Sequence, residues 1–103
     1  MSLFAVKIED SALQDIQAAI DYYEEQQVGL GKKFESAVHR SMIKLSKHPF
    51  YQIRYDNIRC YPLKKYPFMI HFQIQEAKKI VQIIAIFHTS QNPVKWTKSQ
   101  FLE

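Results

Sequence analysis

Cationic and aromatic side chains are interleaved over a short stretch in the middle of this 103-residue sequence. The stretch holds arginines, lysines and tyrosines at Arg54, Tyr55, Arg59, Tyr61, Lys64, Lys65 and Tyr66. Cations of this kind bind phosphates and aromatic rings stack on exposed bases, so the group could hold a nucleic acid or another target. Charged residues on an edge strand also prevent sheet-to-sheet pairing without binding any ligand. The sequence leaves both interpretations open.

Two histidines are the residues best suited to acid–base chemistry. His88 closes an apolar run beside a polar segment, and the ordinary imidazole pKa of about 6.5 suits proton transfer near neutral pH. His71 lies within an alternating apolar segment, and this alternation predicts a half-exposed strand residue. Both are candidate catalytic residues. The alternative for His88, and the one we prefer, is an anchor for the C-terminal turn through hydrogen bonding.

The sequence contains no pattern typical of a metal centre or a bound cofactor. Its four histidines have no compact metal-ligand spacing, and Cys60 is the single cysteine. A glycine-rich phosphate loop and a nucleophile elbow are both missing. No apolar run reaches the roughly 18 residues of a membrane span, and no signal-peptide layout opens the chain. We therefore expect a cytoplasmic protein without a cofactor and without membrane association.

The net charge of +4 is distributed unevenly along the chain. Residues 1–28 contain six carboxylates against Lys7 alone, a balance of −5, so the remaining residues carry +9. A basic surface attracts polyanions such as RNA, or an acidic protein partner. A solvated surface without a ligand has the same composition, so charge alone does not decide the function.

The first half of the sequence predicts the framework that must position these groups. Residues 3–8 are typical of a strand, and Asp10 or Ser11 is the expected cap of a first helix, with Gln14 completing a capping box. The apolar face of that helix is predicted from its spacing to be Ala12, Leu13, Ile16, Ala19, Ile20 and Tyr23. Gly29 is the expected break. The second helix then buries Leu30, Phe34, Ala37, Val38 and Leu45 and ends near His48, because Pro49 disfavours a helical residue before it.

The second half of the sequence changes to the period of strands. Residues 51–55, 58–61, 67–74 and 80–87 are predicted strands, and the third alternates cleanly with Phe68, Ile70, Phe72 and Ile74 on one face. The last is apolar on both faces, as expected of a central strand covered on both sides. The order β-α-α-β-β-β-β predicts a single α+β domain over residues 1–103. In it, a helical hairpin packs on one face of a twisted, mainly antiparallel sheet.

Short motifs spread over almost the whole chain are similar to a known family. They are residues 12–16, Tyr22-Tyr-Glu24, Gly29-Leu-Gly31, Phe34, Leu45, His48-Pro49, Arg59, Leu63, Tyr66-Pro-Phe68, Ile86-Phe-His88, Asn92-Pro93 and Trp96. In their order and spacing they resemble the plasmid-stabilisation branch of the RelE/ParE superfamily of bacterial toxins, where a similar run ends in a His-x-x-Arg-x-Pro-x-x-Trp-like segment. The resemblance implies the fold deduced above.

The resemblance also implies a function and partners. The chain would be the toxin of a type II toxin–antitoxin system, in a hetero-oligomer with a cognate antitoxin and acting on DNA gyrase or on the ribosome and its mRNA. In this comparison Gln91 stands where many relatives carry arginine. It is a candidate target-binding residue that can donate a hydrogen bond but cannot neutralise a phosphate. Residues 68–71 offer only His71 where nucleases often place an arginine. We therefore expect inhibition by target binding. The alternatives are a ribosome-dependent mRNA endonuclease using Arg59, Lys64, Lys65, His71 and His88, and a toxin that has lost its activity.

Overall fold

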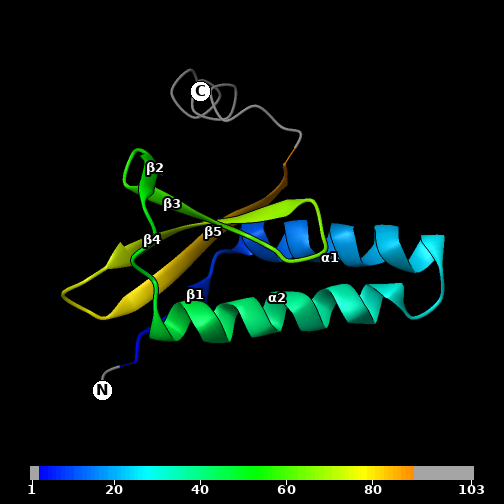
Figure 1. The fold of residues 1–103 in the computed structure, drawn as a ribbon, viewed down its shortest axis with the longest axis horizontal. Helices are drawn as coiled ribbons and strands as arrows, with labels where there is room; N and C mark the ends of the chain where they lie inside the picture. Colours follow the sequence, from blue (N-terminus) through cyan, green and yellow to red (C-terminus); the bar gives the residue numbers. More distant parts are fainter. Residues whose placement is uncertain (1–2, 90–103) are drawn as a thin grey trace.

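The computed structural model describes residues 3–89 as two layers, a helical pair and a sheet (Figure 1). The elements are β1 (Ala5–Ile8), α1 (Asp10–Gln26), α2 (Leu30–Lys47), β2 (Ile53–Tyr55), β3 (Ile58–Pro62), β4 (Phe68–Gln75) and β5 (Ile80–His88). The five strands form one sheet in the order β1-β5-β4-β3-β2. Among the strands of residues 3–89, β1 runs parallel to its neighbour, β5, and the other pairs are antiparallel. The predicted α+β architecture and element order are confirmed.

The core lies between the helices and one face of the sheet. The predicted alternation of β4 is confirmed, because Ile70 and Phe72 are completely buried with Phe34 and Leu45 from α2. On β5, Val81, Ile83 and Ile86 join the same core. The opposite face of β5 is only half-buried at Ile80, Gln82 and Phe87, so the two-sided coverage predicted for this strand is met only in part.

A β-bulge explains why buried residues of β5 change their spacing. His71 pairs with Ala85 whereas Phe72 pairs with Ile83, so Ile84 is an extra residue on β5. The additional residue lets Ile83 and Ile86 face the same core although they are three positions apart. Because β5 is apolar along most of its length, its sequence alone does not indicate where this change in spacing occurs.

The beginning of α1 differs from the predicted capping box. The N-cap is Glu9, which makes no side-chain capping bond, and Ser11 Oγ instead donates to the Ile84 carbonyl oxygen at 3.0 Å. Asp15 accepts a hydrogen bond from the Ile86 backbone N–H at 3.0 Å, while burial raises the pKa of this carboxyl. Strand β1 pairs with β5 only as far as Ile83. Beyond that residue, the side chains of Ser11 and Asp15 bind the backbone groups on this edge of β5.

The exposed face of α1 contains one residue that the pattern places in the core. Leu13 is 49% exposed, whereas Ala12 and Ala19 are buried. Leu13 lies about 100° around the helix from Ala12, at the rim of the apolar stripe. The predicted inclusion of Leu13 in the buried face is wrong, because α1 packs against the core through a narrower stripe made of Ala12, Ile16, Ala19, Ile20 and Tyr23.

The turn between the helices is held by Glu24 and two glycines. The Glu24 carboxylate accepts hydrogen bonds from the backbone N–H groups of Gly29, at 3.0 and 3.1 Å, and of Gly31, at 3.0 Å. Gly29 adopts a φ of 95°, in the left-handed region that favours glycine. A Cβ at Gly31 would lie 2.7 Å from the carbonyl oxygen of Ile20, so the helices approach closely only because this position is glycine. Helix α2 then ends at Lys47, before His48 and Pro49, as predicted.

Within residues 3–89, neither helix is long and apolar enough to cross a membrane.

Candidate functional site

His71, predicted to be half-exposed, is completely buried, and that prediction is wrong. The ring lies on the sheet face away from the helices, where its Nδ1 shares a hydrogen bond of 2.8 Å with the hydroxyl of Tyr55. Cys60 is its cross-strand partner, with Sγ 3.5 Å from Nδ1, and the ring of Phe87 packs edge-on at 5.0 Å. Alternation identified the face of the strand correctly, but side chains from β2, β3 and β5 cover that face.

We call Tyr55, Cys60 and His71 the buried polar cluster. Burial, assisted by the nearby Arg54, lowers the pKa of His71 to about 4. Burial also raises the pKa of Tyr55 to about 12 and raises the pKa of the Cys60 thiol. All three groups are therefore uncharged at neutral pH. They satisfy one another inside the protein and are poorly suited to taking up a proton from a substrate.

His88 is not near this cluster. It ends β5 as an exposed residue and pairs with Phe68, whose ring centroid lies 5.2 Å from the imidazole. Phe68 faces the helices, because its ring also packs 5.4 Å from Phe34. The two candidate catalytic histidines thus lie on opposite faces of the sheet. Gln91 lies outside the described residues.

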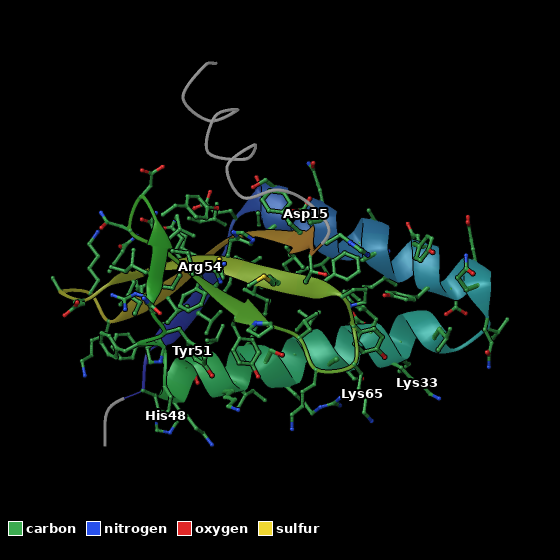
Figure 2. All side chains as sticks on the ribbon, turned by 45° about the horizontal axis from the view of Figure 1, so that its top comes forward. Asp15, Lys33, His48, Tyr51, Arg54 and Lys65 are labelled. Atoms are coloured by element: carbon green, nitrogen blue, oxygen red, sulfur yellow. The ribbon has the colours of Figure 1, made fainter. Side chains whose placement is uncertain are left out.

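Arg54 and Arg59 occupy two separate places near β2. Arg59 Nη1 donates to the carbonyl oxygen of Tyr51 at 2.7 Å, and its guanidinium lies 5.5 Å from the ring centroid of Phe50. Its Nε is buried with no hydrogen-bond partner among the described residues. Arg59 therefore fastens the segment after α2 onto β3. Arg54 is exposed on the short strand β2, well apart from Lys65 in Figure 2.

Lys64 and Lys65 lie in the connection between β3 and β4, where it faces α2 across a groove of about 860 Å³. We call it the basic groove, because six cationic side chains among the described residues line it: Lys32, Lys33, Arg40, Lys44, Lys64 and Lys65. Lys33 and Lys65 lie near one another beside α2 in Figure 2. None of the described residues that line it is acidic, while Tyr61 and Tyr66 contribute aromatic surface. The structure thus separates the four predicted cations and joins two of them to α2.

The contribution of α2 is the part of the basic groove that our sequence interpretation missed. Lys32, Ser36, Arg40 and Lys44 are spaced four residues apart, so they form one row along the helix. The sequence shows this four-residue spacing, but it does not indicate that the β3–β4 connection faces the row of side chains on α2. Lys65 adopts a φ of 71°, and this turn brings the second pair of lysines to the opposite wall.

No metal-binding group of three or more histidine, cysteine or acidic side chains occurs in residues 3–89. The basic groove can bind anions through its cationic side chains, and no histidine or carboxylate is among the described residues that line it. The groove's lysines and arginine are hydrogen-bond donors without acceptor capacity.

The arrangement of elements defines a RelE/ParE-like fold. A chromosomal ParDE toxin–antitoxin system from P. aeruginosa contains a chain that matches with a TM-score of 0.74 and 19% identity, over 84% of this chain and 96% of that one. The isolated E. coli RelE toxin matches with a TM-score of 0.63 and 10% identity, over 97% and 99%. A chain of the intact E. coli RelBE toxin–antitoxin complex has a TM-score of 0.64 and 12% identity, over 86% and 99%. At these identities the likeness shows the fold alone.

The sequence itself identifies the family. Residues 6–93 match the family model described as the ParE toxin of the type II toxin–antitoxin system parDE. The chain therefore belongs to the ParE toxin family, which confirms the resemblance deduced from its motifs. No curated protein matches the sequence.

Proposed function

We propose that this ParE-family toxin arrests bacterial growth by binding DNA gyrase in the cytoplasm, and that a cognate antitoxin neutralises it. Family membership supports the toxin role and the toxin–antitoxin pairing. One observation supports inhibition by target binding: the cationic side chains of the basic groove and the most buried histidine lie in different parts of the molecule. The cations gather in the basic groove, while the histidine best protected from solvent lies in the buried polar cluster.

Metal-free RNA cleavage places strict demands on geometry. A base, a cation and an acid must meet at one phosphate. His71 is buried, has a pKa of about 4 and lies on the sheet face away from the helices, so it does not meet the groove cations. No histidine or carboxylate is among the described residues lining the basic groove. These features support a toxin that holds its target rather than one that cuts RNA.

The experiment is expression of the toxin alone in bacteria, with growth, the DNA-damage response and mRNA integrity followed in the same culture. We expect growth arrest with an induced DNA-damage response and intact mRNA, because a poisoned gyrase leaves broken DNA. Purified toxin is then expected to inhibit supercoiling by gyrase. Rapid mRNA cleavage instead would favour the ribosome-dependent endonuclease. Normal growth would indicate a chain that has kept only antitoxin binding.

Antitoxin pairing is tested separately. Co-expression with the candidate antitoxin is expected to restore growth and to allow both proteins to be purified as one complex.

The variant His88→Ala tests the alternative that the toxin is an enzyme. It should leave the arrest unchanged in a binder, whereas loss of arrest with full antitoxin binding would restore His88 as a catalytic residue.

A further inference from the structure

We propose that the basic groove binds the phosphate backbone of double-stranded DNA, so that the toxin contacts DNA directly at its target. This inference rests on the proposed function for the choice of DNA, since gyrase holds a duplex when it acts. The groove itself is defined by the structure: α2 forms one wall and the β3–β4 connection forms the other.

Positive charge dominates the described lining of the basic groove. Six cations face the groove and no described lining residue carries an opposing carboxylate. The Glu24 carboxylate approaches one end, but it is occupied by hydrogen bonds to the backbone of Gly29 and Gly31. Glu35 does not line the groove but a separate, shallower hollow, which also borders Arg40. The groove is therefore a concentrated positive field, which raises the local concentration of a polyanion.

The polar side chains of α2 that line the groove are spaced regularly along the helix. Along α2, the row formed by Lys32, Ser36, Arg40 and Lys44 advances about 6 Å at each step and about 18 Å in total. Each strand of duplex DNA carries one phosphate for roughly every 3.4 Å along the helix axis, so the row runs past about five phosphates of one strand. Lys64 and Lys65 stand on the facing wall. A long row of cations suits a linear polyanion better than a single small anion.

Lys32 and Lys33 lie in the first turn of α2, at one end of the basic groove. The Glu24 carboxylate already occupies the N-terminus of this helix through the backbone N–H groups of Gly29 and Gly31. A phosphate in the groove would therefore be held by the side chains of Lys32 and Lys33 and not by the helix terminus.

An acidic polypeptide is the competing occupant, and the apolar surface argues against it. Segments that fold into a groove on binding are held mainly by apolar anchors. The large exposed apolar residues include Leu13, Tyr22, Val28, Phe50 and Ile53, and none of them lines the basic groove. The apolar contacts that the described lining offers come from Ala37, Tyr61, Tyr66 and the aliphatic stems of the lysines, and none of these is a large exposed apolar anchor. DNA is therefore the better match for this groove.

The test measures binding of a fluorescently labelled DNA duplex by anisotropy over a series of salt concentrations. The groove variant is Lys64→Gln with Lys65→Gln, and the control is Lys78→Gln with Lys79→Gln in the β4–β5 turn. Both pairs are exposed, both changes remove two charges, and the second lysine of each pair has a positive φ, 71° at Lys65 and 56° at Lys79. The control therefore matches the groove variant in charge and in local backbone.

We expect the groove variant to bind DNA at least about tenfold more weakly at low salt, with the slope of log K against log salt reduced by about two. The control should stay within about twofold of the unmodified toxin. A second variant, Lys33→Gln with Arg40→Gln on the other wall, should resemble the groove variant. Because all the substituted residues are exposed, we expect the melting temperature of each variant to be unchanged. That result would show that the variants fold.

Equal weakening by the groove and control pairs would overturn the proposal, because it would show attraction by overall charge. It would also fail if the unmodified toxin bound polyglutamate but not the duplex, which would favour an acidic partner. A gyrase supercoiling assay separates the two proposals. Groove-dependent DNA binding without gyrase inhibition would refute only the proposed target. Full gyrase inhibition by a groove variant that no longer binds DNA would refute the role of the groove.

Discussion

Two neighbouring residues of β3 belong to opposite regions of this toxin. Cys60 faces away from the helices and joins the buried polar cluster, whereas Tyr61 faces α2 and lines the basic groove. The cluster holds the groups able to exchange protons, yet burial keeps them uncharged. The groove holds exposed cations that can bind but cannot act as bases. The comparison thus separates groups that burial keeps uncharged from groups whose charge stays exposed to solvent.

The largest effect is expected from removing the groove's charge. A variant in which Lys32, Lys33, Lys64 and Lys65 all become Gln should need roughly 100-fold more toxin for the same growth arrest, because four favourable charge contacts are lost. The measurement is growth against induction level, with the protein quantified in the cells. His71→Gln at neutral pH should arrest growth normally. Normal arrest by the groove variant together with lost arrest by His71→Gln would assign the functional role to the buried polar cluster.

The next effect is a pH dependence of stability that originates at His71. Its pKa is about 4 in the folded protein against about 6.5 in the unfolded chain, so the unfolded chain binds more protons between these values. The stabilisation is therefore complete above about pH 6.5 and is lost as the pH falls toward 4, by up to about 3 kcal/mol. Urea unfolding at several pH values should show this decline, and His71→Gln should flatten it.

Asp15 provides a control of opposite sign. Its pKa is raised in the folded protein, so its contribution is greatest at low pH and is lost as the pH rises through the raised pKa. Asp15→Asn should therefore leave the loss of stability below pH 6.5 in place. If Asp15→Asn removed that loss and His71→Gln did not, the assignment to His71 would be wrong.

A structural change in the wall of the groove should have a smaller effect. Gly31→Ala is expected to destabilise the protein by about 2 kcal/mol, because the new Cβ would lie 2.7 Å from the Ile20 carbonyl oxygen. Chemical denaturation would measure it. Gly29→Ala has open space and is expected to cost about 1 kcal/mol, through its φ of 95° alone. Equal effects at the two positions would mean that α2 can move away from α1 without loss.

The smallest effect belongs to the Tyr55 hydroxyl. Tyr55→Phe removes its hydrogen bond to His71 Nδ1 and should lower the free energy of unfolding by about 1 kcal/mol. Growth arrest should not change, because the basic groove is intact. A variant that folded as well as the unmodified toxin but failed to arrest growth would contradict the separation of the two regions.

Most of the fold could be predicted from the sequence because it depends on local periodicity. The helical spacing before Gly29, the proline after His48 and the alternation from Phe68 to Ile74 each act over a few residues. The site was less predictable. Arg54, Arg59, Lys64 and Lys65 are close in sequence, yet Arg59 binds the Tyr51 carbonyl while the two lysines face α2.

Two of the errors, at Ser11 and at His71, share one physical cause. Ser11 was expected to cap its own helix, but its hydroxyl donates to Ile84 of β5, 73 residues away. His71 was expected to be half-exposed, but Tyr55, Cys60 and Phe87 converge on it from three other strands. In both cases a distant element supplied the decisive partner. Propensity and periodicity contain no information about such partners.

The sequence by itself determined the order of the elements, the core face of β4 and the family, because all three follow from residue types at fixed spacing. Only the tertiary structure decided which charged groups work together. The basic groove exists because the β3–β4 connection lies against the cationic row of α2. His71 is uncharged because four strands of the sheet bring it and its neighbours together away from water. Charge and burial depend on three-dimensional neighbours, and those neighbours are set by packing.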